Sequence, residues 1–172
     1  MLEPTPVFPP DLIQAATALL AELRAQGLKV ATAESCTGGL IAGVLTEIPG
    51  SSDIVDRGFV TYSNEAKAEM LGVPAALIAA HGAVSAEVAL AMAAGAIVRS
   101  KADLAVAVTG VAGPGGGSAV KPVGLVHFAM SRRGWQNVHQ ELRFGDLGRS
   151  GIRLATIAQA LTLLREAAGP AR

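Results

Sequence analysis

The chain begins and ends with segments in which apolar residues recur every three or four positions, a spacing that places them on one face of a helix. In residues 11–26 this stripe starts at Leu12, Asp11 can cap the first turn, and Gly27 ends the helix. A second stripe, in residues 149–167, predicts a closing helix. Residues 1–10 are rich in proline and lack this pattern, so we expect an extended N-terminal arm.

Short β-rich runs alternate with helical patterns between these two ends. The predicted strands are residues 28–33, 57–63, 104–108, 124–130 and 136–144, and the predicted inner helices are residues 40–47, 64–71, 74–80 and 86–99. A hairpin turn at residues 132–134 joins the last two strands. Helices before and between the strands, with one late hairpin, indicate a three-layer α/β domain whose mixed sheet is covered on both faces.

Composition narrows the class of protein. With 172 residues, of which 51% are apolar and 16% charged, the chain is expected to form one domain, over residues 11–168. Fourteen basic residues balance fourteen acidic ones, which gives no net field to hold a nucleic acid. The longest apolar stretch, residues 88–98, is too short to span a membrane, and no secretory signal is seen, so we expect a cytoplasmic protein. A single cysteine and three scattered histidines argue against a metal site or metal cofactor.

A serine lies in the turn between the first predicted strand and the helix after it. In sheets of this type, loops at the carboxyl ends of strands gather ligand-binding residues, and Ser35, Tyr62 and Thr109 follow three different strands. Ser35 is therefore a candidate nucleophile, with the backbone amides of residues 36–39 pointing at developing negative charge. The alternative is that Ser35 or Thr37 merely caps the helix.

Lys67 is unusual in its helix, because with Asn64 as the cap it occupies the third helical position, where a cation is unfavourable. The positive end of the helix and partial burial would lower the pKa of Lys67 and leave some of it neutral at pH 7, as a serine-activating base requires. The alternative is a solvated surface lysine. Tyr62 could act beside Lys67 as a proton shuttle or could fill the core.

A glycine-rich loop, residues 110–117, separates the third and fourth predicted strands. Its unhindered backbone amides are of the kind that cradle phosphate, which points to a nucleotide or phosphate ligand. It is neither a Walker loop, which needs Gly-Lys-Ser/Thr, nor a dinucleotide fingerprint, since it leads to a strand. Lys121 and Arg143 could supply charge to the phosphate. The alternative is a flexible hairpin loop.

Six short blocks occur together in this chain. They are residues 33–39 (AESCTGG), 50–52 (GSS), 58–64 (GFVTYSN) with Lys67, 81–85 (HGAVS), 109–114 (TGVAGP) and 121–124 (KPVG). In this order they closely resemble the CinA C-terminal domain family, whose members include nicotinamide mononucleotide deamidases of the PncC type, over residues 12–164. The resemblance implies an anticodon-binding-like α/β/α fold with a mixed, mainly parallel five-stranded sheet, and a homodimer or higher homo-oligomer.

The resemblance also implies an activity, the hydrolysis of nicotinamide mononucleotide to nicotinate mononucleotide and ammonia in pyridine nucleotide salvage. The expected partner is thus a small pyridine nucleotide, and no cofactor is needed. By position, Ser35 resembles the nucleophile and Tyr62 and Lys67 its activating partners. With the glycines and cations named above, the expected substrate-binding residues are Thr37, Gly38, Gly39, Asn64, Thr109, Gly110, Gly113, Gly115, Gly116, Lys121 and Arg143.

Two features depart from the family pattern. The family usually carries Gly-Asp-Arg just before the last helix, whereas here two residues, 147–148, are inserted between Asp146 and Arg149, and Arg153 follows. A contact by that arginine is therefore an open question. Many relatives also carry a pyrophosphatase-like domain before this one. The present sequence shows no such domain, so we expect the standalone form.

Two other functions remain open. One is a nucleotide-binding protein of a competence or damage response that keeps the pocket without turnover. The other is a phosphate-transfer enzyme, which would need a metal-binding carboxylate near residues 110–117, and that loop contains none.

Overall fold

The structure is a computed structural model that describes residues 5–170. Its elements are α1 (Pro10–Gln26), β1 (Val30–Glu34), α2 (Leu40–Thr46), the 3₁₀ turn η1 (Ser51–Asp53), β2 (Val55–Val60), α3 (Asn64–Leu71), α4 (Ala75–His81), α5 (Ala86–Val98), β3 (Leu104–Gly110), β4 (Leu125–Arg132), β5 (Val138–Arg143) and α6 (Gly148–Ala168). Every strand and helix predicted from the sequence is present, with ends that differ by a few residues.

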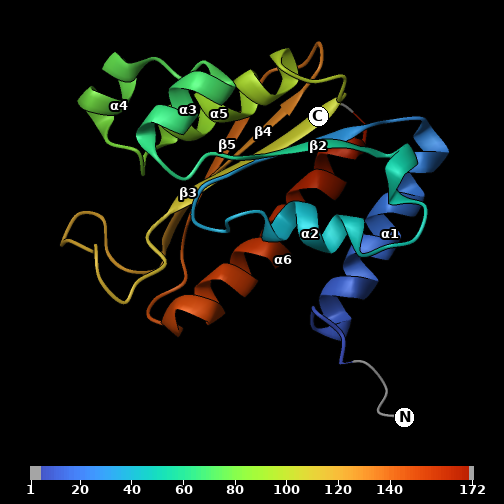
Figure 1. Cartoon of the computed structure of the whole chain (residues 1–172), viewed down its shortest axis with the longest axis horizontal. Helices are drawn as coiled ribbons and strands as arrows, with labels where there is room; N and C mark the ends of the chain where they lie inside the picture. Colours follow the sequence, from blue (N-terminus) through green and yellow to red (C-terminus); the bar gives the residue numbers. More distant parts are fainter. Residues whose placement is uncertain (1–4, 171–172) are drawn as a thin grey trace.

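The five strands form one sheet in the order β2-β1-β3-β4-β5 (Figure 1). β1 pairs in parallel with β2 and β3, while β4 is antiparallel to both β3 and β5. Four strands thus run in one direction and β4 runs in the other, which confirms the predicted mixed sheet. The carboxyl ends of β2, β1 and β3 lie at the same end of the sheet, where the segments that follow parallel strands meet.

Helices cover both faces of the sheet. In Figure 1, α3, α4 and α5 lie on one side and α1, α2 and α6 on the other. Each side has its own apolar cluster: Ala31, Ala33 and Phe59 pack under α5, and Val30, Val106 and Phe128 pack under α1 and α6. The three-layer arrangement is therefore confirmed, and strand alternation decides which layer each side chain faces.

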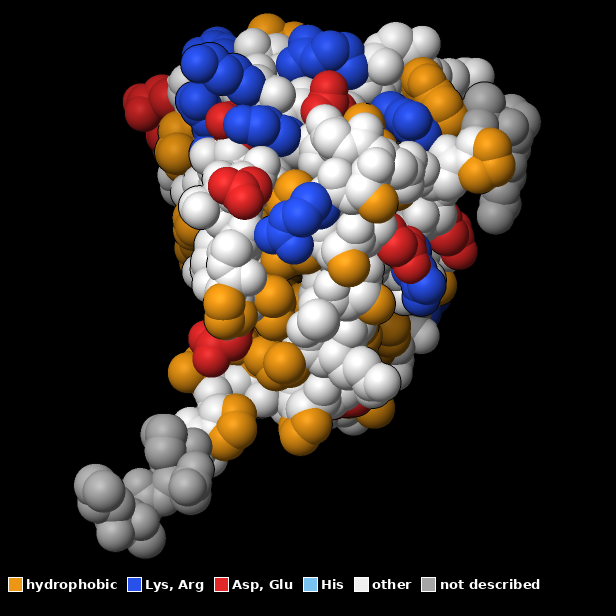
Figure 2. All heavy atoms as spheres, turned by 90° about the vertical axis from the view of Figure 1, so that its right-hand side faces the viewer, with side chains coloured by type: hydrophobic (Ala, Val, Ile, Leu, Met, Phe, Trp, Pro, Cys, Tyr) orange, Lys and Arg blue, Asp and Glu red, His pale blue; other side chains and the backbone are white. Residues whose placement is uncertain are grey.

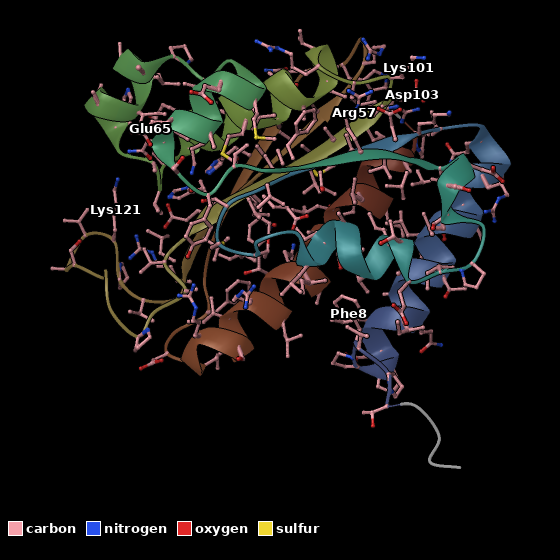
Figure 3. All side chains as sticks on the ribbon, in the orientation of Figure 1. Phe8, Arg57, Glu65, Lys101, Asp103 and Lys121 are labelled. Atoms are coloured by element: carbon pink, nitrogen blue, oxygen red, sulfur yellow. The ribbon has the colours of Figure 1, made fainter. Side chains whose placement is uncertain are left out.

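The start of α1 differs from the prediction. Pro9 is the N-cap and Pro10 the first helical residue, so Asp11 lies inside the first turn and does not cap the helix. Proline suits this position because its missing N–H would be unpaired there anyway. Of the predicted arm, residues 1–4 lie outside the described residues, and the side chain of Phe8 is buried in the apolar cluster under α1 (Figure 3).

The edge of the sheet opposite the carboxyl ends carries charged side chains of both signs. Asp56 forms an ion pair with Arg57 at 2.8 Å and accepts a hydrogen bond from the backbone of Lys101, while Asp103 accepts one from the backbone of Lys29. Figure 3 labels three of these residues, and Figure 2 shows acidic side chains among the basic ones on this side of the molecule. The basic groups there are thus partly neutralised by their neighbours.

No helix within residues 5–170 has both the length and the apolar character needed to cross a bilayer.

Candidate active site

The structure brings Ser35 and Lys67 together. Ser35 follows β1 directly and its amide donates to the carbonyl of Val108, so the end of β3 holds it in place. Lys67 projects from α3, and its Nζ lies 3.0 Å from the Ser35 Oγ. This is hydrogen-bonding distance between a nucleophile candidate and a nitrogen base.

The amine of Lys67 is buried without a counter-ion. The residue is 1% exposed, so the alternative of a solvated surface lysine is wrong. Besides the Ser35 hydroxyl, Nζ contacts the carbonyl oxygens of Thr61 at 2.9 Å and Tyr62 at 3.4 Å, and no carboxylate is among its partners within residues 5–170. Burial lowers the pKa of Lys67 from its ordinary value of 10.5, while the nearby Cys36 thiol acts in the opposite direction.

These contacts suit a neutral amine. A neutral Nζ has two N–H groups and one lone pair, and the two carbonyl oxygens can accept only from N–H. The lone pair is then left for the hydroxyl proton of Ser35. The geometry therefore allows Lys67 to take that proton.

The helical position of Lys67 differs by one residue from the prediction. Ser63 caps α3, with its Oγ accepting from the amide of Ala66 at 3.0 Å, and Asn64 is the first helical residue. Lys67 is therefore in the fourth position and not the third. Its side chain turns inward, and burial rather than the helix end is the main cause of its lowered pKa.

A buried carboxylate that the sequence analysis missed fixes the turn at Ser35. Glu34 is 1% exposed and accepts four hydrogen bonds, from the hydroxyls of Thr32 at 3.0 Å and Thr37 at 2.7 Å and from the amides of Ile41 at 2.8 Å and Ala42 at 3.0 Å. Glu34 thereby accepts hydrogen bonds from the first amides of α2, a role that the side chain of a serine or threonine cap often has in other helices. The alternative that Ser35 or Thr37 caps this helix is wrong, since Gly39 is its N-cap.

The Glu34 network decides which amides of the turn remain available. The amide of Gly38 donates to the carbonyl of Ser35 at 3.1 Å, and the hydroxyl of Thr37 is committed to Glu34. Within the described part of the chain, the amides of Cys36, Thr37 and Gly39 donate to no other residue. Of the amides predicted to face developing negative charge, these three are free to do so, and Gly38 is not.

Two arginines from the start of α6 reach the same edge. Arg153 donates to the carbonyls of Cys36 at 3.2 Å and Thr37 at 3.1 Å. Arg149 donates to the carbonyl of Gly113 at 2.8 Å and to the hydroxyl of Tyr62 at 3.0 Å. The two residues inserted between Asp146 and Arg149 therefore do not keep this arginine from the site.

Of the two roles predicted for Tyr62, the structure contradicts that of a core residue. Its side chain is 61% exposed, so it does not fill the core, and its hydroxyl is bound to Arg149. Its contact with Lys67 is through the backbone carbonyl. Tyr62 follows β2 and Gly113 follows β3, so the Arg149 bridge between them passes over the end of β1, where Ser35 lies.

The other predicted pocket residues differ in how exposed they are. Asn64 is exposed beside Tyr62, whereas Thr109 is buried and its hydroxyl donates to the carbonyl of Ala83 at 2.8 Å. Gly110 belongs to β3, where a Cβ would come within 2.8 Å of the carbonyl oxygen of Leu125. Thr109 and Gly110 therefore shape the wall of the site through packing.

The glycine loop is constrained at its two ends and open at its tip: besides Gly110, a Cβ at Gly117 would lie 2.9 Å from the backbone nitrogen of Val123. Gly113 is buried with φ +76°, and a Cβ there would lie 2.7 Å from Val123. Gly115 and Gly116 are exposed, with nothing within 4 Å of a Cβ. The tip of the loop is thus open to solvent.

The two predicted phosphate-binding cations lie together in a hollow of about 260 Å³ beside the start of α5. Both already have partners: Lys121 donates to the carbonyl of His81 at 2.7 Å, and Arg143 pairs with Glu141 at 2.8 Å. Lys121, labelled in Figure 3, lies on the loop that leads into β4. Arg149, by contrast, is the arginine that binds the glycine loop itself.

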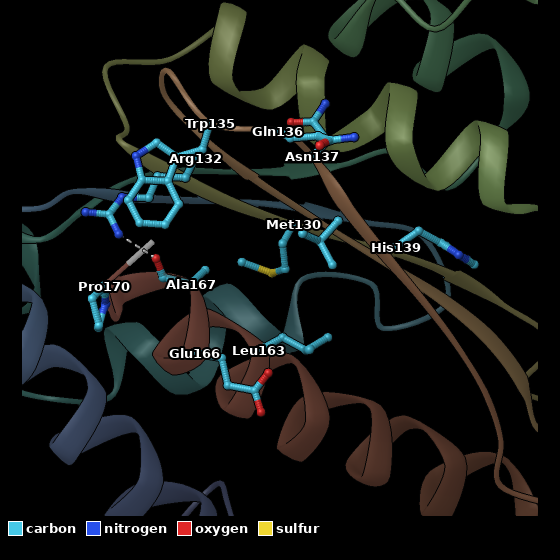
Figure 4. A pocket seen from close by; sticks show the side chains of 11 residues that line it. Met130, Arg132, Trp135, Gln136, Asn137, His139, Leu163, Glu166, Ala167 and Pro170 are labelled. Atoms are coloured by element: carbon cyan, nitrogen blue, oxygen red, sulfur yellow. Dashed lines mark hydrogen bonds between the residues drawn. The ribbon is translucent and has the colours of Figure 1, made fainter. Parts of the chain in front are cut away.

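A larger hollow, of about 560 Å³, lies away from this site (Figure 4). Met130, Arg132, Trp135 and Leu163 are among its lining residues, and Arg132 stacks on the ring of Trp135. Arg132 pairs with Leu104 at the start of β3, so this hollow is at the far end of the sheet from Ser35. Within residues 5–170 no three His, Cys, Asp or Glu side chains are grouped to hold a metal ion.

Comparison with known proteins places this geometry in context. The family described as the CinA C-terminal domain matches residues 13–168. The nicotinamide-nucleotide amidohydrolase PncC of Escherichia coli K12 is 49% identical over 155 residues, which cover 90% of this chain and 93% of that protein. A CinA-like protein of Mycobacterium marinum is 57% identical over 139 residues, 81% of this chain and 32% of its own length. This chain spans about a third of the length of several such longer relatives.

The fold is also found in solved structures. The competence/damage inducible protein CihA from Agrobacterium tumefaciens superimposes with a TM-score of 0.91 at 57% identity, covering 93% of this chain and 97% of that one. A CinA superfamily protein from Klebsiella pneumoniae gives a TM-score of 0.86 at 36% identity, covering 91% and 97%. These likenesses extend over nearly the whole domain.

Proposed function

The chain belongs to the CinA C-terminal domain family, and on that premise we propose that it is an amidohydrolase that converts nicotinamide mononucleotide to nicotinate mononucleotide and ammonia. The observation that carries the proposal is the 3.0 Å contact between the Ser35 hydroxyl and a buried lysine amine that has no counter-ion. The identity with the amidohydrolase of Escherichia coli, over 93% of that protein, supports the choice of substrate.

The proposed reaction begins when Ser35 Oγ attacks the carboxamide carbon and its proton moves to Lys67 Nζ. The carbonyl π electrons move to the oxygen, which accepts hydrogen bonds from the free amides of the turn, those of Cys36, Thr37 and Gly39. The protonated Lys67 then gives its proton to the amide nitrogen, the C–N bond breaks and ammonia leaves. Water, deprotonated by the same amine, hydrolyses the ester and frees Ser35.

We assign Tyr62 to the substrate rather than to the proton transfer. Its hydroxyl is held by Arg149, its ring is exposed, and its backbone carbonyl contacts Lys67 Nζ at 3.4 Å. Nicotinamide in the mononucleotide is a pyridinium cation, and an aromatic face attracts such a cation. The ring of Tyr62 would thus favour the nucleotide over neutral amides.

For the phosphate we propose the open tip of the glycine loop, at Gly115 and Gly116, with Arg149 of α6, which donates to the carbonyl of Gly113 in that loop, as its cation. Lys121 and Arg143 are secondary candidates because each is held by another partner. We further propose that the protein acts in the cytoplasm, in pyridine nucleotide salvage, as a homo-oligomer.

The rival function is nucleotide binding without turnover, as in a competence or damage response. The buried and uncompensated amine favours the enzyme, because a binding protein gains nothing from an unpaired buried lysine placed against a serine. The two functions differ in one observable, which is whether ammonia appears.

The test is a coupled ammonia assay of the purified chain with nicotinamide mononucleotide and with free nicotinamide. We expect release from the nucleotide, and a loss in kcat of about 10³-fold or more in Ser35→Ala. Ser100→Ala is the matched control, since Ser100 lies beyond the end of α5 and bonds the carbonyl of Ala96. Saturable binding of the nucleotide without ammonia would favour the rival, and full activity in Ser35→Ala would exclude the proposed nucleophile.

A further inference from the structure

Thr61 carries the one buried side-chain oxygen or nitrogen atom in residues 5–170 that has no hydrogen-bond partner. Its side chain is completely buried. Burying a hydroxyl without a partner is unfavourable, and buried polar groups in folded proteins are almost always paired. This hydroxyl therefore calls for a physical explanation.

The position of Thr61 places it in the wall of the candidate site. Its amide donates to the carbonyl of Glu34 at 2.8 Å, which continues the parallel ladder one step beyond β2 and sets Thr61 beside Ser35. Alternation along the strand turns the Thr61 side chain toward the same face as Phe59, which is the face covered by α3 and α5. Lys67 reaches Ser35 from that face.

The backbone of Thr61 already serves the amine. Its carbonyl oxygen is the shortest contact of Lys67 Nζ, at 2.9 Å, while the carbonyl of Tyr62 is at 3.4 Å. A protonated amine has three N–H groups. One faces the Ser35 oxygen or the departing nitrogen, and one donates to the Thr61 carbonyl. The third has only the Tyr62 carbonyl, whose 3.4 Å distance is longer than an ordinary N–H···O hydrogen bond, so the charged form lacks a second short acceptor.

We propose that Thr61 is a positioning residue of the Ser35–Lys67 pair, whose hydroxyl is unpaired in the resting protein and accepts a hydrogen bond from the ammonium of Lys67 once Ser35 has given up its proton. A rotation about χ1 is sufficient to re-aim a threonine hydroxyl. No bond is made or broken at Thr61, and the proton stays on Nζ until the leaving nitrogen takes it. This inference rests on the proposed chemistry of Ser35 and Lys67.

The test compares Thr61→Val, which keeps the shape and removes the hydroxyl, with Thr61→Ser, which keeps the hydroxyl. We expect Thr61→Val to lower kcat about ten- to hundredfold, the range for a hydrogen bond to a charged group, with little change in KM because the substrate is not touched. Thr61→Ser should keep most of kcat. The melting temperature of Thr61→Val should equal or exceed that of the wild type, because the lost hydroxyl had no partner.

Thr156→Val is the matched control. Thr156 is also completely buried, but its hydroxyl donates to the carbonyl of Ile152 at 2.7 Å within α6. Thr156→Val should therefore lower the melting temperature and leave kcat unchanged. A Thr61→Val variant that melts lower and keeps its kcat would show that Thr61 is only structural, and would overturn the inference.

The dependence of kcat/KM on pH distinguishes the two roles, because a purely structural role of Thr61 would leave it unchanged. Activity requires neutral Lys67 and so rises as pH rises through its pKa. Removing an acceptor of the ammonium makes protonation harder, so the acid limb of the kcat/KM profile should move to lower pH in Thr61→Val. An unmoved or oppositely shifted acid limb would contradict the proposed hydrogen bond.

A second assay separates this inference from the choice of substrate. A fluorophosphonate reacts with an activated serine by forming a P–O bond to Ser35 with loss of fluoride, while the hydroxyl proton moves to Lys67. We expect Thr61→Val to slow this labelling as it slows kcat. If the wild type is labelled but releases no ammonia from the nucleotide, the substrate is wrong and the role of Thr61 can still be measured. Equal labelling rates in the wild type and Thr61→Val would overturn that role.

Discussion

Replacing Glu34 by Gln tests how the turn at Ser35 is held. Each carboxylate oxygen accepts one hydroxyl and one backbone amide: Oε1 from Thr37 and Ile41, and Oε2 from Thr32 and Ala42. The amide of Gln has nearly the same shape but offers one oxygen and one NH₂ group. A hydroxyl that faces the NH₂ can rotate and accept, whereas a backbone N–H cannot. In either orientation one amide of α2 is left facing another donor.

The expected loss follows from that geometry. An unsatisfied buried amide destabilises by about 1–3 kcal/mol, and the remaining bonds weaken because a neutral acceptor replaces a charged one, so we expect about 2–4 kcal/mol in total. For a domain of this size that corresponds to a melting temperature lower by about 5–15 °C. The free energy of unfolding is measured by urea denaturation, with the exposed Glu47→Gln as a control that should change it by less than about 0.5 kcal/mol. A loss below about 1 kcal/mol in Glu34→Gln would refute the assigned network.

Three further outcomes follow from the site and its surroundings. Tyr62→Phe should keep most of kcat, whereas Tyr62→Ala should raise KM about five- to tenfold because the aromatic face is lost. Steady-state kinetics measures both, and a collapse of kcat in Tyr62→Phe would instead support the proton-shuttle role. Gly110→Ala should destabilise the fold by about 1–3 kcal/mol because its Cβ would meet the carbonyl of Leu125, while Gly115→Ala, in open space, should melt like the wild type. Equal melting temperatures for the two variants would contradict the packing between β3 and β4. Burial raises the pKa of Cys36 to about 12, so at pH 7 the thiol should react with a disulfide reagent only after unfolding; rapid labelling of the folded chain would disprove its burial.

The sequence was sufficient for the fold because the apolar pattern is regular and each turn has a recognisable residue. It was less reliable at the ends of elements, where two suitable residues compete. Ser63 and Asn64 are adjacent and both suit an N-cap, and only the structure shows that Ser63 caps α3. The position of Lys67 in its helix shifted by one residue for that reason.

The parts of the site that sequence reasoning missed depend on contacts between distant residues. Glu34 belongs by sequence to the turn, but a carboxylate directly after a buried apolar strand is a signal for a buried hydrogen-bond network. Arg149 reaches Tyr62 across 87 positions, and Lys121 reaches His81 across 40. Spacing along the chain carries no information about such pairs, so the exposure of Tyr62 and the partners of the cations required the structure.

The central claim is that Ser35 and Lys67 act as one unit, and a double-mutant cycle on kcat measures this most directly. Ser35→Ala and Lys67→Met should each lower kcat for ammonia release severely. The kcat of the double variant should equal that of the less active single variant, because either change already removes the same proton transfer. If the two losses instead multiply, the hydroxyl and the amine contribute independently, and the proposed mechanism is wrong.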